Sequence, residues 1–175
     1  MVELETDRLR LRQFREDDLS RYLDLVGDPE VMRYIGRGVT LDEAGAWGQI
    51  SMILGHWQLR GYGLWAIEHK PTGALLGRAG LYSPPGWPGL EVGWALCRAY
   101  WGQGYATEAG RAALDWGFGN LETNRIISCI QPANKGSIRV AQRLGETLLW
   151  DQPLLGIPTF IYGIERADWH EKGRK

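Results

Sequence analysis

The sequence predicts a single α+β domain of 175 residues, a length that one hydrophobic core can serve. Two short apolar runs, 64–68 and 74–81, are joined by the turn-forming residues 70–73, which indicates an early hairpin. A strand–helix–strand order follows later in the chain, over 90–97, 105–118 and 125–130. A hairpin followed by a strand–helix–strand unit favours a sheet of mixed direction.

The other elements follow from hydrophobic periodicity and from turn residues. Thr40 and Glu43 fit a capping box at the start of one helix, and Gly145 fits the residue that ends another. A polar, frayed tail is expected beyond Trp169. These expected elements are a strand over 8–12, helices over 15–26, 40–59 and 134–144, and strands over 147–150 and 159–164 with a loop over 151–158.

Composition and charge exclude several functional classes. The net charge of −1 gives no general attraction to nucleic acid, and no apolar run approaches the roughly 18 residues of a membrane helix. The first residues lack an export signal, so a cytoplasmic enzyme, monomeric or homodimeric, is expected. Four arginines alternate with acidic residues near the start and are interpreted as a solvated strand face: Arg8, Arg10, Arg12 and Arg15.

The cysteines and histidines predict neither a metal site nor a covalent intermediate. Cys97 and Cys129 lie far apart, each in an apolar run, which favours reduced strand residues over a disulfide or a nucleophile. The three histidines form no group with them and are expected to be structural or exposed: His56, His69 and His170.

Residues 98–109, R-A-Y-W-G-Q-G-Y-A-T-E-A, lie between a predicted strand and a predicted helix. Gly102 and Gly104 lack a Cβ, so the backbone can approach a ligand closely. The free amides and the dipole of the new helix favour a phosphate or diphosphate at this turn. No lysine follows Gly104 as in a Walker loop, and Thr107 stands where a dinucleotide fingerprint has its third glycine. The loop is therefore expected to hold a diphosphate through its backbone.

The segment W-G-Q-G-Y-A-T-E-A resembles the acyl-CoA loop of the GNAT acyltransferase superfamily, Gln/Arg-x-x-Gly-x-Gly/Ala, at Trp101, Gly104 and Ala106. Tryptophan in place of Gln/Arg is similar to the RimJ/RimL branch of ribosomal-protein N-terminal acetyltransferases. Residues 6–19 and D-P-E-V-M-R-Y over 28–34 resemble the same branch. The resemblance extends to about residue 169 and implies a mixed, mostly antiparallel sheet with a splayed pair of central strands.

The resemblance implies acetyl-CoA as co-substrate, with no metal. Asn134 in P-x-N-x-x-S is expected to contact the pantetheine arm, although capping of the following helix is the alternative and both can hold. The expected coenzyme-binding residues are Leu96, Cys97, Arg98, Gly102, Gln103, Gly104, Tyr105, Ala106, Thr107 and Asn134.

Two catalytic residues are expected. Ser137 is the candidate acid for the leaving thiolate, because the resemblance to RimJ/RimL-type members implies a serine in this role, and Ala141 stands where many other family members have tyrosine; the alternative is a helix serine bonded to a backbone carbonyl. Glu91 is the candidate base, and an exposed or structural glutamate is its alternative. Backbone amides near Leu96 are expected to meet the oxyanion.

The acceptor is an amine that attacks the thioester directly. A protein N-terminal α-amine is favoured over a small amine such as an antibiotic or polyamine, and a non-catalytic acyl-CoA sensor is the rival class. Trp87, in a Pro/Gly loop, is the tryptophan best placed to touch the acceptor. Glu146 follows Gly145 where the family has phenylalanine, so weaker packing at the helix end is expected, without effect on the coenzyme site.

Overall fold

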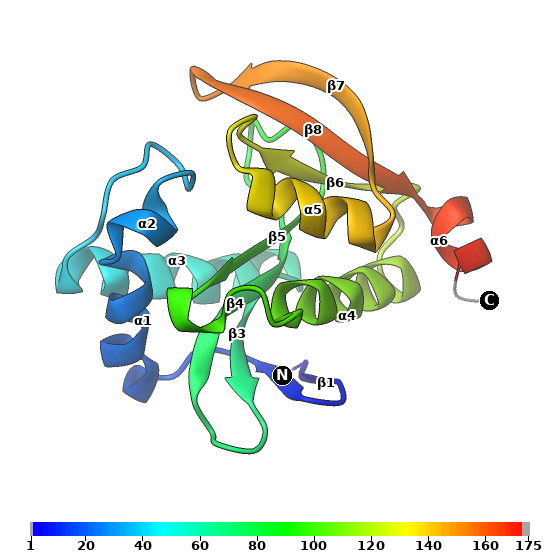
Figure 1. Cartoon of the computed structure of the whole chain (residues 1–175). Helices are drawn as coiled ribbons and strands as arrows, with labels where there is room; N and C mark the ends of the chain where they lie inside the picture. The colour runs from blue at the N-terminus through cyan, green and yellow to red at the C-terminus, as the bar shows by residue number, and fades with distance from the viewer. Residues whose placement is uncertain (1, 173–175) are drawn as a thin grey trace.

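The computed structural model describes residues 2–172 and contains an eight-stranded sheet in the order β1-β2-β3-β4-β5-β6-β8-β7 (Figure 1). Neighbouring strands are antiparallel except β5 and β6, which run parallel. The predicted mixed sheet is thereby confirmed. The strands are β1 Leu4–Glu5, β2 Leu9–Arg12, β3 Leu64–His69, β4 Leu75–Tyr82, β5 Glu91–Leu96, β6 Arg125–Ile130, β7 Thr147–Leu154 and β8 Ile157–Glu165.

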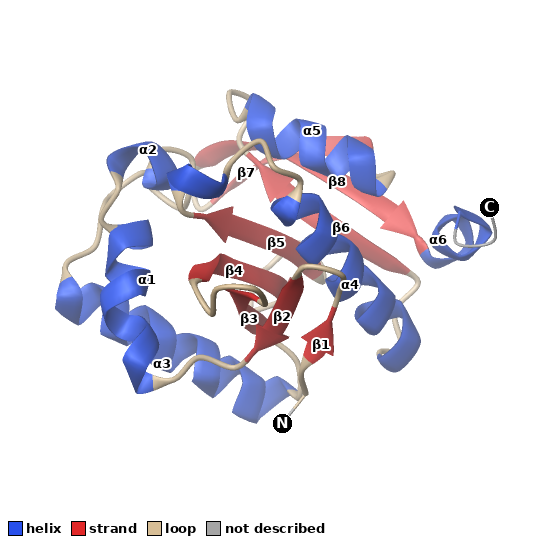
Figure 2. Cartoon of the chain, turned by 60° about the horizontal axis from the view of Figure 1, so that its bottom comes forward, coloured by secondary structure: helices blue, strands red, loops and turns tan. Residues whose placement is uncertain are grey.

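Helices cover both faces of the sheet (Figure 2). Helices α1 (Leu19–Val26) and α3 (Glu43–Arg60) pack on one face, with the short α2 (Pro29–Met32) against α1. Helices α4 (Tyr105–Asn120) and α5 (Lys135–Leu144) cover the other face, and α6 (Arg166–Lys172) follows β8. Two 3₁₀ turns, η1 (Glu16–Asp18) and η2 (Arg98–Tyr100), precede α1 and follow β5. No helix within residues 2–172 has the length and apolar character needed to cross a bilayer.

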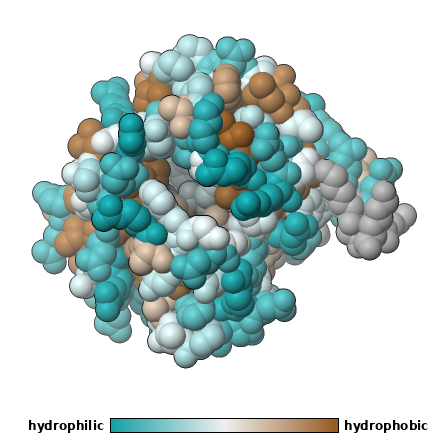
Figure 3. Space-filling model, in the orientation of Figure 1, coloured by the Kyte–Doolittle hydropathy of each residue, from teal (hydrophilic) through white to brown (hydrophobic). Residues whose placement is uncertain are grey.

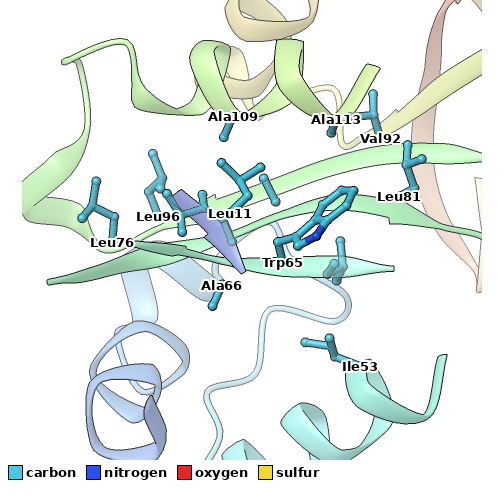
Figure 4. Packing of buried hydrophobic residues seen from close by; sticks show 14 of the residues in the cluster. Leu11, Ile53, Trp65, Ala66, Leu76, Leu81, Val92, Leu96, Ala109 and Ala113 are labelled. Atoms are coloured by element: carbon cyan, nitrogen blue, oxygen red, sulfur yellow. The ribbon is translucent and has the colours of Figure 1, made fainter. Parts of the chain in front are cut away.

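The main core lies between the sheet and α4, with a second layer under α3 (Figure 4). Ala109 and Ala113 of α4 face the sheet, and Ile53 of α3 packs on its other side. Gly117 allows α4 to lie this close, because a Cβ there would come within 2.9 Å of Leu81 Cδ1. The position of α4 on the sheet fixes the position of its N-terminus. Residues 98–104, called the phosphate loop below, end at this point.

Two local predictions are wrong. Asp42 rather than Thr40 caps α3, because its Oδ1 accepts from Gly45 N at 2.8 Å while Thr40 lies two residues upstream of the cap position. The predicted loop over 151–158 is instead a hairpin turned by Leu155 and Gly156, which adopt φ angles of 51° and 80°. The predicted frayed tail is helical as far as Lys172, and residues 173–175 lie outside the described part of the chain.

The predicted solvated face holds for Arg8, Arg10 and Arg15, whose side chains are 43%, 42% and 57% exposed, and is wrong for Arg12. Arg12 is 6% exposed and binds Asp18, 5% exposed, through two hydrogen bonds of 2.8 Å. Arg12 Nε also donates to Glu68 Oε2 at 2.6 Å. Strand β2 lies inside the sheet between β1 and β3, so the Arg12 side chain meets acids from η1 and β3 instead of water.

Strands β5 and β6 part after a single register pair, Glu91 with Ile127, which confirms the predicted splayed strands. Side chains replace the missing ladder bonds. Ser128 Oγ donates to the carbonyl of Val92 at 2.8 Å, and Glu91 Oε1 accepts from Cys129 N at 3.4 Å. The backbone of both strands is therefore partly satisfied where the sheet opens.

Glu146 lies just after α5 and contacts Ser128 of β6, beside the opening between β5 and β6. This contact contradicts the weak packing that was expected at the end of the helix. Glu146 is 3% exposed, and its Oε1 lies 3.0 Å from Ser128 Oγ, while Oε2 has no partner among the described residues. The hydroxyl of Ser128 has one proton, which it gives to the Val92 carbonyl. Both contacts hold together when Glu146 is a neutral acid that donates to Ser128. Burial, reinforced by the charge of Glu91, raises the pKa of Glu146 to about 8.

The raised pKa of Glu146 predicts a pH-dependent stability that glutamine at this position removes. The native state retains a proton that the unfolded state releases near 4.5, so this contribution is complete below pH 4.5 and is lost as the pH rises to about 8. Glu146→Gln cannot ionise and keeps an N–H donor. Its stability relative to wild type should increase over that range by up to ~1.4 kcal/mol per pH unit, measured by urea unfolding.

The exposed Glu122→Gln provides the matched control and should show no such pH-dependent difference. A constant stability difference between Glu146→Gln and wild type from pH 5 to pH 8.5 would contradict a neutral Glu146.

Candidate active site

The phosphate loop has the geometry expected of a backbone anion site. Gly102 and Gly104 adopt φ angles of 74° and 85°, which favour glycine. Helix α4 has no side-chain cap, and its first internal hydrogen bond runs from Glu108 N to Gly104 O. The amides of residues 105–107 therefore precede the helical bonding pattern and are available to a ligand, at the positive end of the helix dipole.

Arg8, in the bend between β1 and β2, holds this loop. Its Nη1 donates to the carbonyl of Gln103 at 3.0 Å, its Nε donates to Glu108 Oε2 at 2.7 Å, and its guanidinium lies 4.3 Å above the ring of Tyr105. Thr6 Oγ1 also donates to Glu108, at 2.6 Å. Sequence reasoning missed this contact, because the only signal for it is that the T-D-R-L-R opening and the glycine loop occur in the same chain.

A groove of about 510 Å³ lies beside the loop and the split between β5 and β6. The surface is hollowed here between α2 and α5 (Figure 3). The groove is lined by the end of β5, by loop and helix residues 100–107, by residues 30–35 around α2, and by residues 133–143 around α5. One groove thus joins the phosphate loop to the open end of the sheet.

Most of the predicted site residues line this groove, namely Leu96, Gly102, Gly104, Tyr105, Ala106, Thr107, Asn134 and Ser137. Cys97, Arg98 and Gln103 lie outside its lining. Arg98 Nε is 3.3 Å from Asp28 Oδ2, and the Gln103 side chain donates to Ala99 O, so both side chains hold the loop. Their contact with a ligand stays a prediction.

Asn134 and Ser137 lie at the start of α5. Asn134 Oδ1 accepts from Ser137 N at 3.1 Å, so Asn134 caps the helix, while its amide nitrogen has no hydrogen bond among the described residues. No hydrogen bond of the Ser137 hydroxyl to a backbone carbonyl is present within residues 2–172, and its role as the acid stays a prediction. Both free groups can meet a ligand in the groove.

Backbone donors also point into the split. Cys97 N donates to Leu76 O across the antiparallel pair, so the amides of Leu96 and Trp94 face the side of β6, where no ladder continues. The indole of Trp101 donates to Leu96 O at 2.8 Å and fixes the end of the strand against the loop. Trp101, the residue that departs from the family's Gln/Arg, is therefore held by a hydrogen bond to the end of β5.

Glu91 lies where the split begins and outside the groove lining. Burial raises the pKa of its carboxyl to about 7, although hydrogen bonds from the Trp87 indole and from Cys129 oppose the rise. Trp87 Nε1 lies 2.5 Å from Glu91 Oε2, and its ring packs on Tyr82. A carboxyl with this pKa can gain or lose a proton near neutral pH.

The thiols are poor nucleophiles. Burial, with the nearby charge of Asp24, raises the pKa of Cys97 to about 11, and burial also raises the pKa of Cys129. Both are protonated at neutral pH. His56 is bonded to Tyr62 O and to Ser83 N, as a structural histidine is. Within the described residues, no three histidine, cysteine or acidic side chains are grouped as metal ligands.

One further observation supports coenzyme A as the ligand of the groove. Thr107 is among the residues that line the groove, and its Oγ1 is buried without a hydrogen-bond partner among the described residues. A phosphate oxygen at the N-terminus of α4 would supply that partner. The diphosphate end of the groove and the unpaired amides of the split are thus connected, as a long thioester ligand requires.

Known proteins give a consistent assignment. A model of the "Acetyltransferase (GNAT) domain" family matches residues 8–147. The chain is 35% identical over 166 residues to the uncharacterised protein YkkB of Bacillus subtilis, covering 87% of this chain and 92% of that protein. It is 33% identical over 146 residues to the uncharacterised N-acetyltransferase p20 of Bacillus licheniformis, covering 82% of each.

Solved structures agree on the fold. An acetyltransferase from Agrobacterium tumefaciens has a TM-score of 0.84 at 32% identity, covering 94% of this chain and 95% of that one. A RimL ribosomal α-N-protein acetyltransferase in complex with coenzyme A has a TM-score of 0.78, covering 94% of this chain and 98% of that one. At 16% identity, the RimL structure shares the fold alone. The chain belongs to the GNAT acetyltransferase family and is an acetyl-CoA-dependent N-acetyltransferase.

Proposed function

We propose that this enzyme acetylates an α-amine, in the first place that of a protein N-terminus, by direct transfer from acetyl-CoA, as RimJ/RimL-type enzymes do. The observation that carries the proposal is Glu91, a carboxyl with a pKa of about 7 at the opening of the sheet. At pH 7, deprotonation costs roughly 1.4 kcal/mol for an α-amine of pKa about 8, and roughly 4.6 kcal/mol for a lysine of pKa about 10.4. A base as weak as Glu91 suits the first of these acceptors.

The coenzyme is held along the groove. The amides of residues 105–107 and the hydroxyl of Thr107 bind its diphosphate, and the free amide nitrogen of Asn134 bonds the pantetheine arm. This position brings the thioester carbonyl to the amide of Leu96 in the split. An oxyanion formed there is stabilised by a donor that is already oriented.

Transfer then takes one addition and one elimination. The neutral amine attacks the carbonyl carbon, the new C–N bond forms, and the C–S bond breaks to release the coenzyme A thiolate. The amine proton passes to Glu91 through water, because three to five residues of strand, ~10–17 Å, separate Glu91 from Trp94 and Leu96. The thiolate takes the Ser137 proton, which solvent replaces. The protonated thiols of Cys97 and Cys129 favour this direct route over an acyl-enzyme.

The proposed acceptor class is tested with acetyl-CoA and a peptide panel. Each peptide is supplied with a free N-terminus and an acetylated lysine, and in the reverse form with a blocked N-terminus and a free lysine. Thiol release, and a mass gain equal to one acetyl group in place of one hydrogen, are expected only for free N-termini. Transfer to lysine forms or to polyamines would overturn the α-amine proposal, and no release with any amine would favour a non-catalytic sensor.

Glu91→Gln should lower kcat/KM about 10²- to 10⁴-fold, because it removes general-base catalysis. In wild type, activity should rise with pH through about 7 as Glu91 loses its proton. In Glu91→Gln only the ionisation of the amine should remain in the pH profile. Steady-state kinetics from pH 5.5 to 9 measures both effects.

Trp87→Phe provides the matched check for the role of Glu91. It removes a hydrogen bond that lowers the Glu91 pKa, so the acid limb should move to higher pH. A profile for Glu91→Gln identical to that of wild type would exclude Glu91 as the base.

Ser137→Ala should reduce kcat by about tenfold or less, because a thiol of pKa about 8.5 leaves readily without an acid. The KM for acetyl-CoA should change little. The exposed helix serine Ser20, changed to alanine, is the matched control and should retain full turnover. Unchanged kcat in Ser137→Ala at pH 6 to 9 would show that Ser137 does not act as the acid.

A further inference from the structure

Two arginines occupy one row across the sheet but differ in their partners. The register aligns Arg12 with Ala66, Ala66 with Arg78, and Arg78 with Ala95, from β2 through β5. Arg12 is neutralised by Asp18 and Glu68. Arg78 has neither an ion pair nor a hydrogen bond among residues 2–172, and its Nε is buried without a partner. A guanidinium that is partly removed from water without an anion or a hydrogen-bond acceptor carries an uncompensated desolvation cost.

Arg78 lies on the acceptor side of the opening. The strand pair aligns Tyr82 with Glu91, so Arg78 shares its sheet face with the candidate base. Its cross-strand neighbour Ala95 lines the groove, next to Leu96, where the thioester carbonyl is placed. A Cβ added at Gly93 on the same face would meet only Glu91 Oε1, at 3.7 Å, so little fills this part of the face.

No carboxylate of the described chain serves Arg78. Asp18 and Glu68 already bind Arg12, and Glu68 also binds Arg15. Glu91 feels the charge of Arg78 without a contact between them, and burial still raises its pKa to about 7. Burial likewise raises the pKa of Tyr82, and the charge of Arg78 opposes that rise. The charge of Arg78 thus acts on Glu91 and Tyr82 at the opening, and no carboxylate within residues 2–172 pairs with it.

We infer that Arg78 binds a carboxylate of the acceptor, so that the enzyme selects amines that carry a carboxylate near the reacting nitrogen. This inference rests on the proposed transfer to an amine and specifies the chemical class of the acceptor. A guanidinium presents paired donors that match the two oxygens of a carboxylate, and such charge-assisted bonds are among the strongest in proteins. The anion also orients the amine towards the thioester beside Leu96.

This carboxylate has two possible sources, the α-carboxylate of a free amino acid and the side chain of Asp or Glu near a peptide N-terminus. Matched acceptors distinguish them: phenylalanine with its amide, and peptides that differ only by Glu or Gln at the first or second position. Wild type should prefer the acid member by at least tenfold in kcat/KM in one of the two arms. The arm that shows the preference identifies the source.

Arg78→Met should lower kcat/KM for the preferred acid at least tenfold and bring its ratio to the neutral partner close to one. Arg78→Lys, which keeps the charge but not the paired donors, should recover part of the preference. Arg60→Met removes an exposed cation that has no ion pair within residues 2–172 and should keep the wild-type ratio. Coenzyme A titration by calorimetry verifies that each variant is folded.

Thiol release without any preference for the acid members, or a preference that persists in Arg78→Met, would overturn the inference and leave the proposed function intact. If no acceptor releases thiol, the proposed function fails, and binding decides the inference. Calorimetry of the coenzyme A complex with N-acetylphenylalanine and its amide, and with the N-acetylated Glu and Gln peptides, should then show tighter binding of the acid in wild type but not in Arg78→Met. Equal binding of both members in both pairs would overturn it.

Discussion

The parting of β5 and β6 is the constraint on which the site depends. A sheet that continued past Glu91 and Ile127 would use the amides of Trp94 and Leu96 in its own ladder, and no donor would remain for a thioester. Opening a sheet leaves backbone groups without partners, which is costly unless other groups replace them. Here the side chains of Ser128 and Glu91 replace two of these partners, so the strands remain apart while the open end stays available.

The phosphate loop depends on a second, distant contact. Its backbone grip needs Gly102 and Gly104 at positive φ, and two glycines separated by one residue make a flexible segment. Arg8, the residue before β2, limits this freedom by binding Gln103 O and Glu108, and β2 is itself held inside the sheet. The loop is therefore positioned between the N-terminal strand and α4, and coenzyme binding is linked to the packing of the first residues of the chain.

Local patterns were sufficient to predict most of the fold. The strand Arg125–Ile130 and the glycine loop follow from short-range rules, and resemblance supplied the splayed strands. Contacts between distant segments could not be predicted in this way. The alternating charges of β2 look like a solvated face until Asp18 and Glu68 are brought to Arg12 by the fold, and Glu146 looks like a packing defect until Ser128 lies beside it. The order of residue types shows the periodicity of helices and strands. It does not show which distant residue will pair with a buried polar side chain.

The buried charges around the opening form one electrostatic arrangement. On the α5 side, burial raises the pKa of Glu146 to about 8, so near neutral pH this support adds no second negative charge next to Glu91. On the opposite face, burial keeps the Glu91 pKa near 7, while Arg78 favours its ionised form. An acceptor carboxylate that neutralises Arg78 weakens this effect and makes Glu91 a stronger base. Under the proposed roles of Arg78 and Glu91, the charge of one unpaired arginine couples the binding of the acceptor to the transfer of its proton.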